Sequence, residues 1–167
     1  MRALGIDFGE KRIGVAISDP AGRVAVPLQT LARRNDRSAL AQIAEIARRE
    51  GVERLVLGEP LGSAGERGPA AERVRRFGTR LAAATALPLT FVDESLTSVE
   101  AAARLRAAGL DPRRHRERID AVAAQILLQD DLDRGAGVAV RPGAPGPAAD
   151  AAGAATAGPT PAAPRRS

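Results

Sequence analysis

The first residues of the chain carry the pattern that most restricts its fold. Residues 4–19 read LGIDFGEKRIGVAISD, which predicts two short β-strands joined by a tight turn, with Asp7 where an apolar residue is expected. Alternate residues of a strand share a face, so Asp7 lies with Gly5 and Gly9. One face of the second strand is nearly bare as well, through Gly14, Ala16 and Ser18. A carboxylate on a cleared, rigid β-surface suits a metal ion or a phosphate–metal complex. The alternative is an Asp that caps the hairpin turn.

The composition describes a single domain without cysteine chemistry. The chain has 167 residues, enough for one domain with a real core and too few for two large ones. It contains no cysteine, which excludes a disulfide framework and a thiolate metal site. Neither the apolar run of a signal peptide nor an uncharged stretch long enough for a bilayer is present in the sequence. The expected location is therefore the cytoplasm.

The hydrophobic pattern predicts an α/β fold followed by a disordered tail. Residues 135–167 are mainly Ala, Gly, Pro and Thr and cannot bury enough surface to offset the entropy of ordering them, so the folded domain is expected over 1–134. Periodicity predicts strands at about 2–8, 12–18, 24–30, 52–58 and 87–92, and helices at about 36–50, 69–84, 97–109 and 119–132. This order implies an antiparallel hairpin followed by parallel strands that are joined by crossover helices, and hence a mixed central sheet flanked by helices.

Two adjacent acids follow the last predicted strand. Asp93 and Glu94 come directly after residues 87–92 and precede a helix whose start, Thr97 to Glu100, matches the capping box. Ligands gather outside the carboxyl ends of strands in open α/β sheets, which favours a functional site. The alternative is that one of the acids stabilises the helix N-terminus, although Thr97 already supplies the cap.

A third acid completes a possible metal site. Asp120 is predicted in the first turn of the last helix, where an Asp is equally well explained as a cap or dipole partner. Its small alanine neighbours would let this helix approach the sheet beside Asp7. Asp7, Glu94 and Asp120 would then form an all-oxygen cage for Mg²⁺ or Mn²⁺, with Asp93 as an alternate ligand. Such ions activate water and stabilise the leaving oxygen in phosphodiester hydrolysis.

The basic residues are compatible with a polyanionic partner. The formal net charge is +5. Contacts to a phosphate backbone, which are sequence-blind and salt-sensitive, are expected from Lys11, Arg12, Arg113, Arg114, Arg116 and Arg118. His115, the only histidine, lies in this basic segment and is expected to be solvated rather than catalytic.

Four sequence blocks resemble one known family. They read IDFGEKRIGVAISD, LVLGEPLGSAGERGPAAERVRRFGTRL, VDESLTSVEA and RIDAVAAQILLQDDLD, and together, over 1–134, they resemble the YqgF family, also called RuvX. The resemblance implies a ribonuclease H-like mixed sheet, with the family's acids on Asp7, Glu94 and Asp120. It also implies a nuclease acting on the 5′ end of precursor 16S ribosomal RNA or, by an older proposal, on Holliday junctions. Glu59 and Ser95 depart from the family pattern, which usually has Leu or similar and Arg there.

Two other functions remain open. The same fold without catalysis would be a nucleic-acid-binding factor in ribosome assembly or transcription, and Glu59 and Ser95 would fit a site that has drifted. A sugar-kinase or actin-like ATPase also uses Asp-x-Gly in a first hairpin, but needs two copies of the fold, and no second hairpin of this kind follows in the sequence. We therefore expect a metal-dependent nuclease. Its partner would be structured RNA, or branched DNA, and it would act as a monomer or homodimer.

Overall fold

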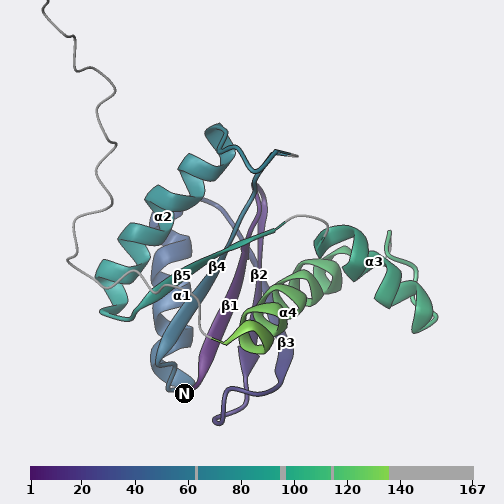
Figure 1. The fold of residues 1–167 in the computed structure, drawn as a ribbon, viewed down its shortest axis with the longest axis horizontal. Coiled ribbons are helices and arrows are strands. Elements are labelled where there is room, and N and C mark those ends of the chain that lie inside the picture. The colour runs from purple at the N-terminus through teal and green to yellow at the C-terminus, as the bar shows by residue number, and fades with distance from the viewer. Residues whose placement is uncertain (63, 95–96, 114, 136–167) are drawn as a thin grey trace, which may run out of the picture.

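The chain folds around a five-stranded mixed sheet (Figure 1). The computed structural model describes residues 1–62, 64–94, 97–113 and 115–135. The elements are β1 (Ala3–Phe8), β2 (Arg12–Ser18), β3 (Ala25–Ala32), α1 (Asp36–Arg49), β4 (Arg54–Glu59), α2 (Pro69–Thr85), β5 (Leu89–Asp93), α3 (Thr97–Ala107) and α4 (Arg116–Arg134). Their order is the predicted one, and the mixed α/β fold is confirmed.

The strand order gathers the acidic strand ends at one edge of the sheet. The strands lie in the order β3-β2-β1-β4-β5. β1 pairs antiparallel with β2, with Asp7 opposite Gly14, and parallel with β4 on its other side. β5 extends the sheet parallel to β4, and Glu59 lies opposite Asp93 at the end of that ladder. The carboxyl ends of β1, β4 and β5 therefore point the same way, toward the edge where ligands bind in such sheets.

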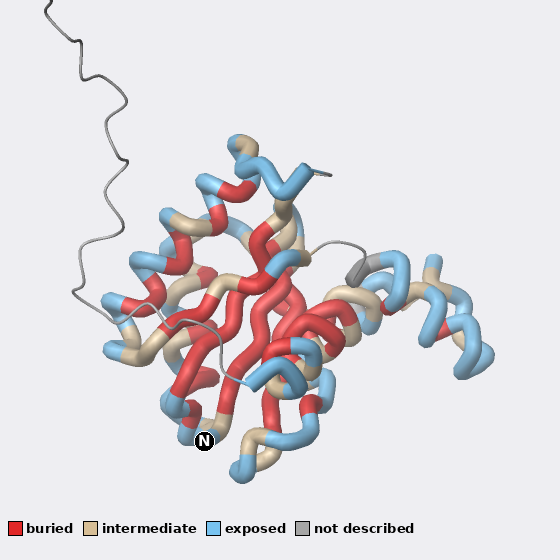
Figure 2. Tube along the Cα trace, viewed as in Figure 1, coloured by how far each residue is buried: buried red, intermediate tan, exposed pale blue. Residues whose placement is uncertain are grey.

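The two faces of the sheet differ in side-chain size, and both are covered (Figures 1 and 2). One face carries large apolar side chains such as Leu4, Ile6 and Leu57, which form the main core with the apolar residues of α1 and α2. The other face carries small residues such as Ala3 and Ala16, which pack with the apolar side of α4. Small side chains on this face allow a helix to lie close to the strands.

Glycines let α4 touch the backbone of the sheet. A Cβ atom at Gly14 would stand 1.8 Å from the backbone oxygen of Asp120, and one at Gly5 would stand 2.7 Å from Cβ of Leu128. The bare strand face that the sequence predicts is therefore present, but α4 covers much of it. Our expectation that this face is cleared for a metal complex needs correction, because the glycines first serve helix packing. The same close approach carries Asp120 to the neighbourhood of Asp7.

The last helix is longer than predicted. α4 begins at Arg116 rather than near residue 119, so Asp120 lies in its second turn and outside the first turn, where capping and dipole effects act. Near its other end, Asp131 forms a buried ion pair of 2.5 Å with Arg54, the first residue of β4. α4 is therefore fixed to the sheet near both of its ends.

Several predictions fall on residues outside the described ones. These are the tail over residues 136–167, together with Arg114 and Ser95. The cap expected from the side chain of Thr97 is also outside the described part, whereas Glu100 pairs with Arg104 at 3.1 Å. Among the residues that are described, none of the helices has the length and apolar character needed to cross a membrane.

Candidate functional site

Asp7 and Glu94 form a hydrogen-bonded pair at the carboxyl edge of the sheet. Asp7 lies near the end of the central strand β1 and is 7% exposed. Glu94 follows β5, and its backbone N–H donates to the carbonyl oxygen of Glu59 at 3.0 Å, which fixes it against β4. The side chains of Asp7 and Glu94 are hydrogen-bonded to each other. Two carboxyl groups can share such a bond only when one of them carries a proton.

The electrostatics show which group holds that proton. Burial raises the pKa of Glu94 to about 9, and the hydrogen bond to Asp7 and the charges of Asp7 and Asp93 act in the same direction. Burial also raises the pKa of Asp7, the hydrogen bond from Glu94 opposes this, and the charge of Asp120 adds to it. At neutral pH Glu94 is therefore the proton donor and Asp7 the acceptor.

The third predicted acid is held by an arginine. Nε of Arg12 donates to the carboxylate of Asp120 at 2.5 Å, across from β2 to α4. Asp120 still lies close enough to Asp7 for its charge to raise the pKa of that group. The structure thus brings the three acids to one region, with two in contact and the third paired elsewhere. Within the described part of the chain, no three His, Cys, Asp or Glu side chains form a group able to hold a metal ion.

Asp93 lies differently from Glu94. It is the last residue of β5 and is exposed. Side chains alternate along a strand, so Asp93 lies on the face opposite to Val92, which packs in the small-residue cluster with α4. Asp7 is on the α4 face. Asp93 therefore acts on the pair through its charge, and Glu94 makes the contact with Asp7.

Gly58 makes room for the carboxyl group of Glu94, and sequence reasoning missed it. A Cβ atom at this position would stand 2.6 Å from Cδ1 of Leu127 and 3.0 Å from Oε2 of Glu94. A side chain at Gly58 would therefore push against α4 and the acidic pair together. The signal in the sequence was a glycine that ends an apolar strand just before Glu59-Pro60.

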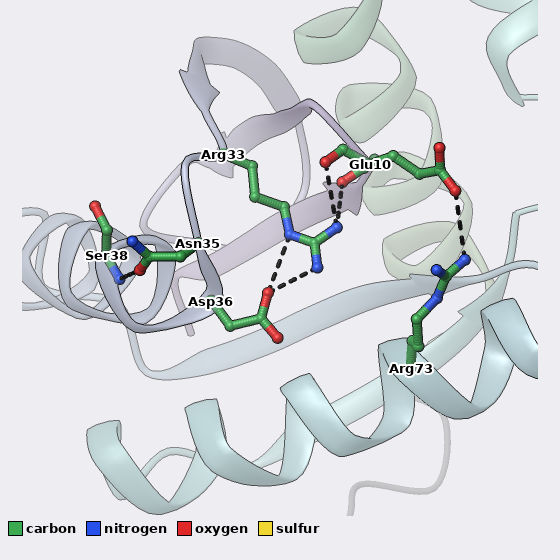
Figure 3. A network of polar contacts seen from close by, with 7 residues as sticks. Glu10, Arg33, Asn35, Asp36, Ser38 and Arg73 are labelled. Carbon is green, nitrogen blue, oxygen red and sulfur yellow. Dashed lines mark hydrogen bonds and ion pairs between the residues drawn. The ribbon is translucent and has the colours of Figure 1, made fainter.

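The turn that carries Lys11 and Arg12 is anchored from below by Arg33 (Figure 3). The guanidinium of Arg33 donates to the carbonyl oxygens of Gly9 and Glu10 and to Asp36, and its backbone N–H donates to the carbonyl oxygen of Lys11 at 2.9 Å. The guanidinium of Arg33 also lies over the ring of Phe8. These contacts fix the backbone from which Lys11, which is exposed, projects.

The other predicted basic residues lie at the start of α4. Arg113 is exposed in the preceding loop, and Arg116 and Arg118 are exposed on the first turn of the helix. Arg116 precedes Asp120 by four positions, which places the two on the same side of α4. His115 is the N-cap residue of α4 and is partly exposed.

A small cavity opens beside Glu94. It has a volume of about 200 Å³, and Phe8, Pro60 and Val74 form part of its apolar wall. Arg33 and Arg73 also line it, and Arg73 makes an exposed ion pair of 3.4 Å with Glu10 (Figure 3). Glu94 of the acidic pair therefore lines an open pocket that has cationic side chains in its wall.

The sequence comparisons now decide the family. Residues 1–134 match the family model described as "RuvX: Holliday junction resolvase". This chain belongs to the RuvX family. It is 49% identical over 130 residues to a protein of Chloroflexus aurantiacus, a match that covers 78% of this chain and 85% of that protein. It is 50% identical over 134 residues to a protein of Moorella thermoacetica, covering 80% and 96%. Both are named "Putative pre-16S rRNA nuclease".

The fold of this RuvX chain also has a likeness among solved structures. RuvC of T. thermophilus, in complex with a Holliday junction substrate, gives a TM-score of 0.53 at 16% identity, covering 80% of this chain and 94% of that chain. At this identity the likeness concerns the fold, a mixed sheet flanked by helices. The predicted ribonuclease H-like architecture is confirmed.

One residue that departs from the RuvX pattern has a definite role in the structure. Glu59 is 4% exposed and accepts hydrogen bonds from Arg75 and Arg67. It is therefore paired and hydrogen-bonded within the fold. Sequence reasoning selected neither arginine.

Proposed function

We propose that this chain is a nuclease that hydrolyses phosphodiester bonds in the 5′ leader of precursor 16S ribosomal RNA. Membership of the RuvX family and the names of the relatives that it matches support this proposal. The observation that carries it is the Asp7–Glu94 pair, a buried and a partly buried carboxyl group in contact at the carboxyl edge of the sheet, with Asp120 close by. Strongly perturbed acids in such a position are typical of catalytic sites.

The donor chemistry of these residues suits a hard divalent cation, although in the described structure the three side chains do not form a single group. Asp7, Glu94 and Asp120 offer only carboxylate oxygens, which Mg²⁺ and Mn²⁺ prefer. The raised pKa of Glu94 reflects burial next to other negative charges, and a bound cation would relieve both effects. We propose these three residues as the ligands. When bound, the cation supplies an activated water and stabilises charge on the leaving oxygen.

The remaining residues of the site bind and orient the substrate. Arg12 lies against Asp120, so a phosphate bound by Arg12 is placed beside the carboxylates. Lys11 shares the anchored turn, and Arg113, Arg116 and Arg118 extend the basic surface to the start of α4. Contacts of this kind position the phosphate backbone without reading its sequence.

The proposal is tested by comparing two substrates. Purified protein is incubated with a precursor 16S 5′-leader RNA and with a four-way DNA junction, each with Mg²⁺ or Mn²⁺, beside Asp7→Asn as the inactive control. We expect cleavage of the RNA by the wild type alone. Cleavage of only the junction would support a Holliday junction resolvase, which the description of the family model also names. Cleavage of neither would contradict the nuclease and favour a non-catalytic binding factor.

A further inference from the structure

Glu59 is a buried carboxylate whose backbone is hydrogen-bonded to Glu94 of the acidic pair. It ends β4 on the side of the sheet that packs with α2, and its carbonyl oxygen accepts the backbone N–H of Glu94 at 3.0 Å. Its side chain is 5% exposed. A buried charge is tolerated only when it is paired and hydrogen-bonded, so its partners have to be considered with it.

Two arginines share this one carboxylate. Arg75, from the second turn of α2, donates through Nε at 2.5 Å and through a terminal nitrogen at 2.8 Å, and its guanidinium lies 4.5 Å from the centre of the Phe91 ring. Arg67, just before α2, donates through Nε at 3.0 Å. One arginine would neutralise Glu59. With the second, the three side chains together carry one positive charge, beside Asp93, which lies opposite Glu59 in the ladder.

The second arginine also faces solvent. The side chain of Arg67 is 59% exposed and that of Arg75 is 33% exposed, whereas Glu59 is closed off. Among the described residues, the side chain of Arg67 donates a hydrogen bond through Nε alone, so its two terminal guanidinium nitrogens can donate to another acceptor. A guanidinium held in this way suits the bidentate recognition of a phosphate.

We infer that Glu59 positions Arg67, backed by Arg75, as a phosphate-binding subsite for the RNA backbone beside the Asp7–Glu94 pair. This inference rests on the proposed function. Glu59 is a positioning residue: it touches no substrate and acts by fixing the direction of a cation that does. The departure of Glu59 from the family pattern then marks a contact through which this chain holds its substrate.

The direction in which Glu59→Gln changes RNA affinity distinguishes the positioning of Arg67 from a general effect of net charge. Removing an acid makes a protein more positive, so by long-range electrostatics alone Glu59→Gln should tighten the binding of a polyanion. The positioning role predicts the reverse, because Arg67 loses its fixed direction. Glu72→Gln is the matched control: Glu72 lies in the first turn of the same helix, has a side chain 67% exposed and belongs to no such cluster.

The experiment measures binding of a fluorescein-labelled 5′-leader RNA in EDTA, at several salt concentrations. We expect Arg67→Gln and Glu59→Gln each to weaken binding and to lower the slope of log K against log salt by about 0.7 to 0.9, the value for one lost phosphate contact. Glu72→Gln should leave the slope unchanged and binding as tight or tighter. The double variant Glu59→Gln/Arg67→Gln should bind like Arg67→Gln alone, because both changes remove one contact.

Two outcomes overturn the inference. One is tighter or unchanged binding by Glu59→Gln, as for the control, and the other is an unchanged salt slope for Arg67→Gln. Arg67 is exposed, so its variant keeps the test valid even if Glu59→Gln lowers the melting temperature. Cleavage is measured separately with Mn²⁺. If the variants bind RNA like the wild type and cleave it normally, the subsite is contradicted and the nuclease proposal is not. If the salt slopes are as expected but the wild type does not cleave the RNA, the nuclease proposal is contradicted and the subsite is not.

Discussion

A single proton lies between Asp7 and Glu94 at neutral pH, since the pKa of Glu94 is about 9 through burial and its acidic neighbours. The folded protein therefore holds a proton that the unfolded chain gives up. A divalent cation bound as proposed would compete for the same oxygens, so its binding would release that proton.

Glu94→Gln is expected to flatten the dependence of stability on pH. The pKa of Glu94 is about 9 in the folded protein and ordinary, near 4.5, in the unfolded chain, so the folded state binds more protons between these values. The free energy of unfolding of the wild type in EDTA should fall as the pH rises from about 5 to about 9, and the variant should lose this part of the slope. Chemical denaturation across that window measures both. A wild-type stability that rises with pH there would contradict the assignment.

Asp7→Asn separates a metal ligand from a structural aspartate. It removes one charge at nearly constant volume, which relieves repulsion in the metal-free protein. We expect metal-dependent cleavage to fall by at least about 100-fold, with a melting temperature in EDTA equal to or above that of the wild type. Melting curves with and without Mn²⁺ give the second readout, because only the wild type should gain from the ion. A variant that melts lower, beside a wild type indifferent to Mn²⁺, would show that Asp7 holds the hairpin instead.

The acids could be selected from the sequence because each stands at a recognisable place. Asp7 interrupts an apolar strand, and Glu94 follows the last one. Their partners could not be selected, because the contacts join distant parts of the chain: Arg12 and Asp120 are 108 positions apart. The role of Glu59 was hidden for the same reason, since it depends on Arg75 in a helix of the opposite layer.

Among the secondary-structure elements, α4 connects packing to the site. Its order in the chain and its type were predicted from apolar spacing, because period and length distinguish it from a strand. Its first turn was missed, because Arg116 and Arg118 add nothing to an apolar pattern. The close approach of α4 to the sheet was indicated in the sequence only by small residues, and the sequence does not show which element packs against them. The backbone of α4 at Asp120 lies so close to Gly14 that only a glycine in β2 allows this distance between the helix and the sheet.

Gly14→Ala is expected to destabilise the fold through α4. The new Cβ atom would stand 1.8 Å from the backbone oxygen of Asp120, and a helix backbone cannot turn aside as a side chain can. We expect a loss of about 3 kcal/mol or more in the free energy of unfolding, at the upper end for overpacking. Gly68→Ala, where a Cβ atom meets nothing within 4 Å, is the control and should cost less than about 1 kcal/mol. Equal losses for the two variants would mean that α4 does not lie on β2.

For the molecule as a whole, charge and fold are arranged around one edge of the sheet. The acidic pair lies at the carboxyl end of the strands, the anchored turn with Lys11 lies beside it, and Arg116 and Arg118 begin the helix that carries Asp120. A surface of this kind binds a polyanion mainly by releasing its counterions, so affinity should depend steeply on salt.

Arg116→Gln combined with Arg118→Gln is expected to weaken RNA binding without changing stability. Both side chains are exposed at the start of α4, so their loss removes phosphate contacts and little packing. The slope of log K against log salt should fall by up to about two units, one for each contact. Arg48→Gln, at the far end of α1 and 74% exposed, should leave the slope as it is. An unchanged slope for the double variant would show that these arginines point away from the substrate.

The contact between α4 and the first hairpin also means that the proposed site is assembled late in the synthesis of the chain. Gly14 and Arg12 leave the ribosome early, whereas Asp120, which lies against both, follows 108 positions after Arg12. Domains fold as their segments emerge, N-terminal parts first. The hairpin therefore waits with one face open until α4 arrives. If Asp120 is a ligand as proposed, a nascent chain without α4 has an incomplete site and should not cut RNA, including the message and the ribosome that are producing it.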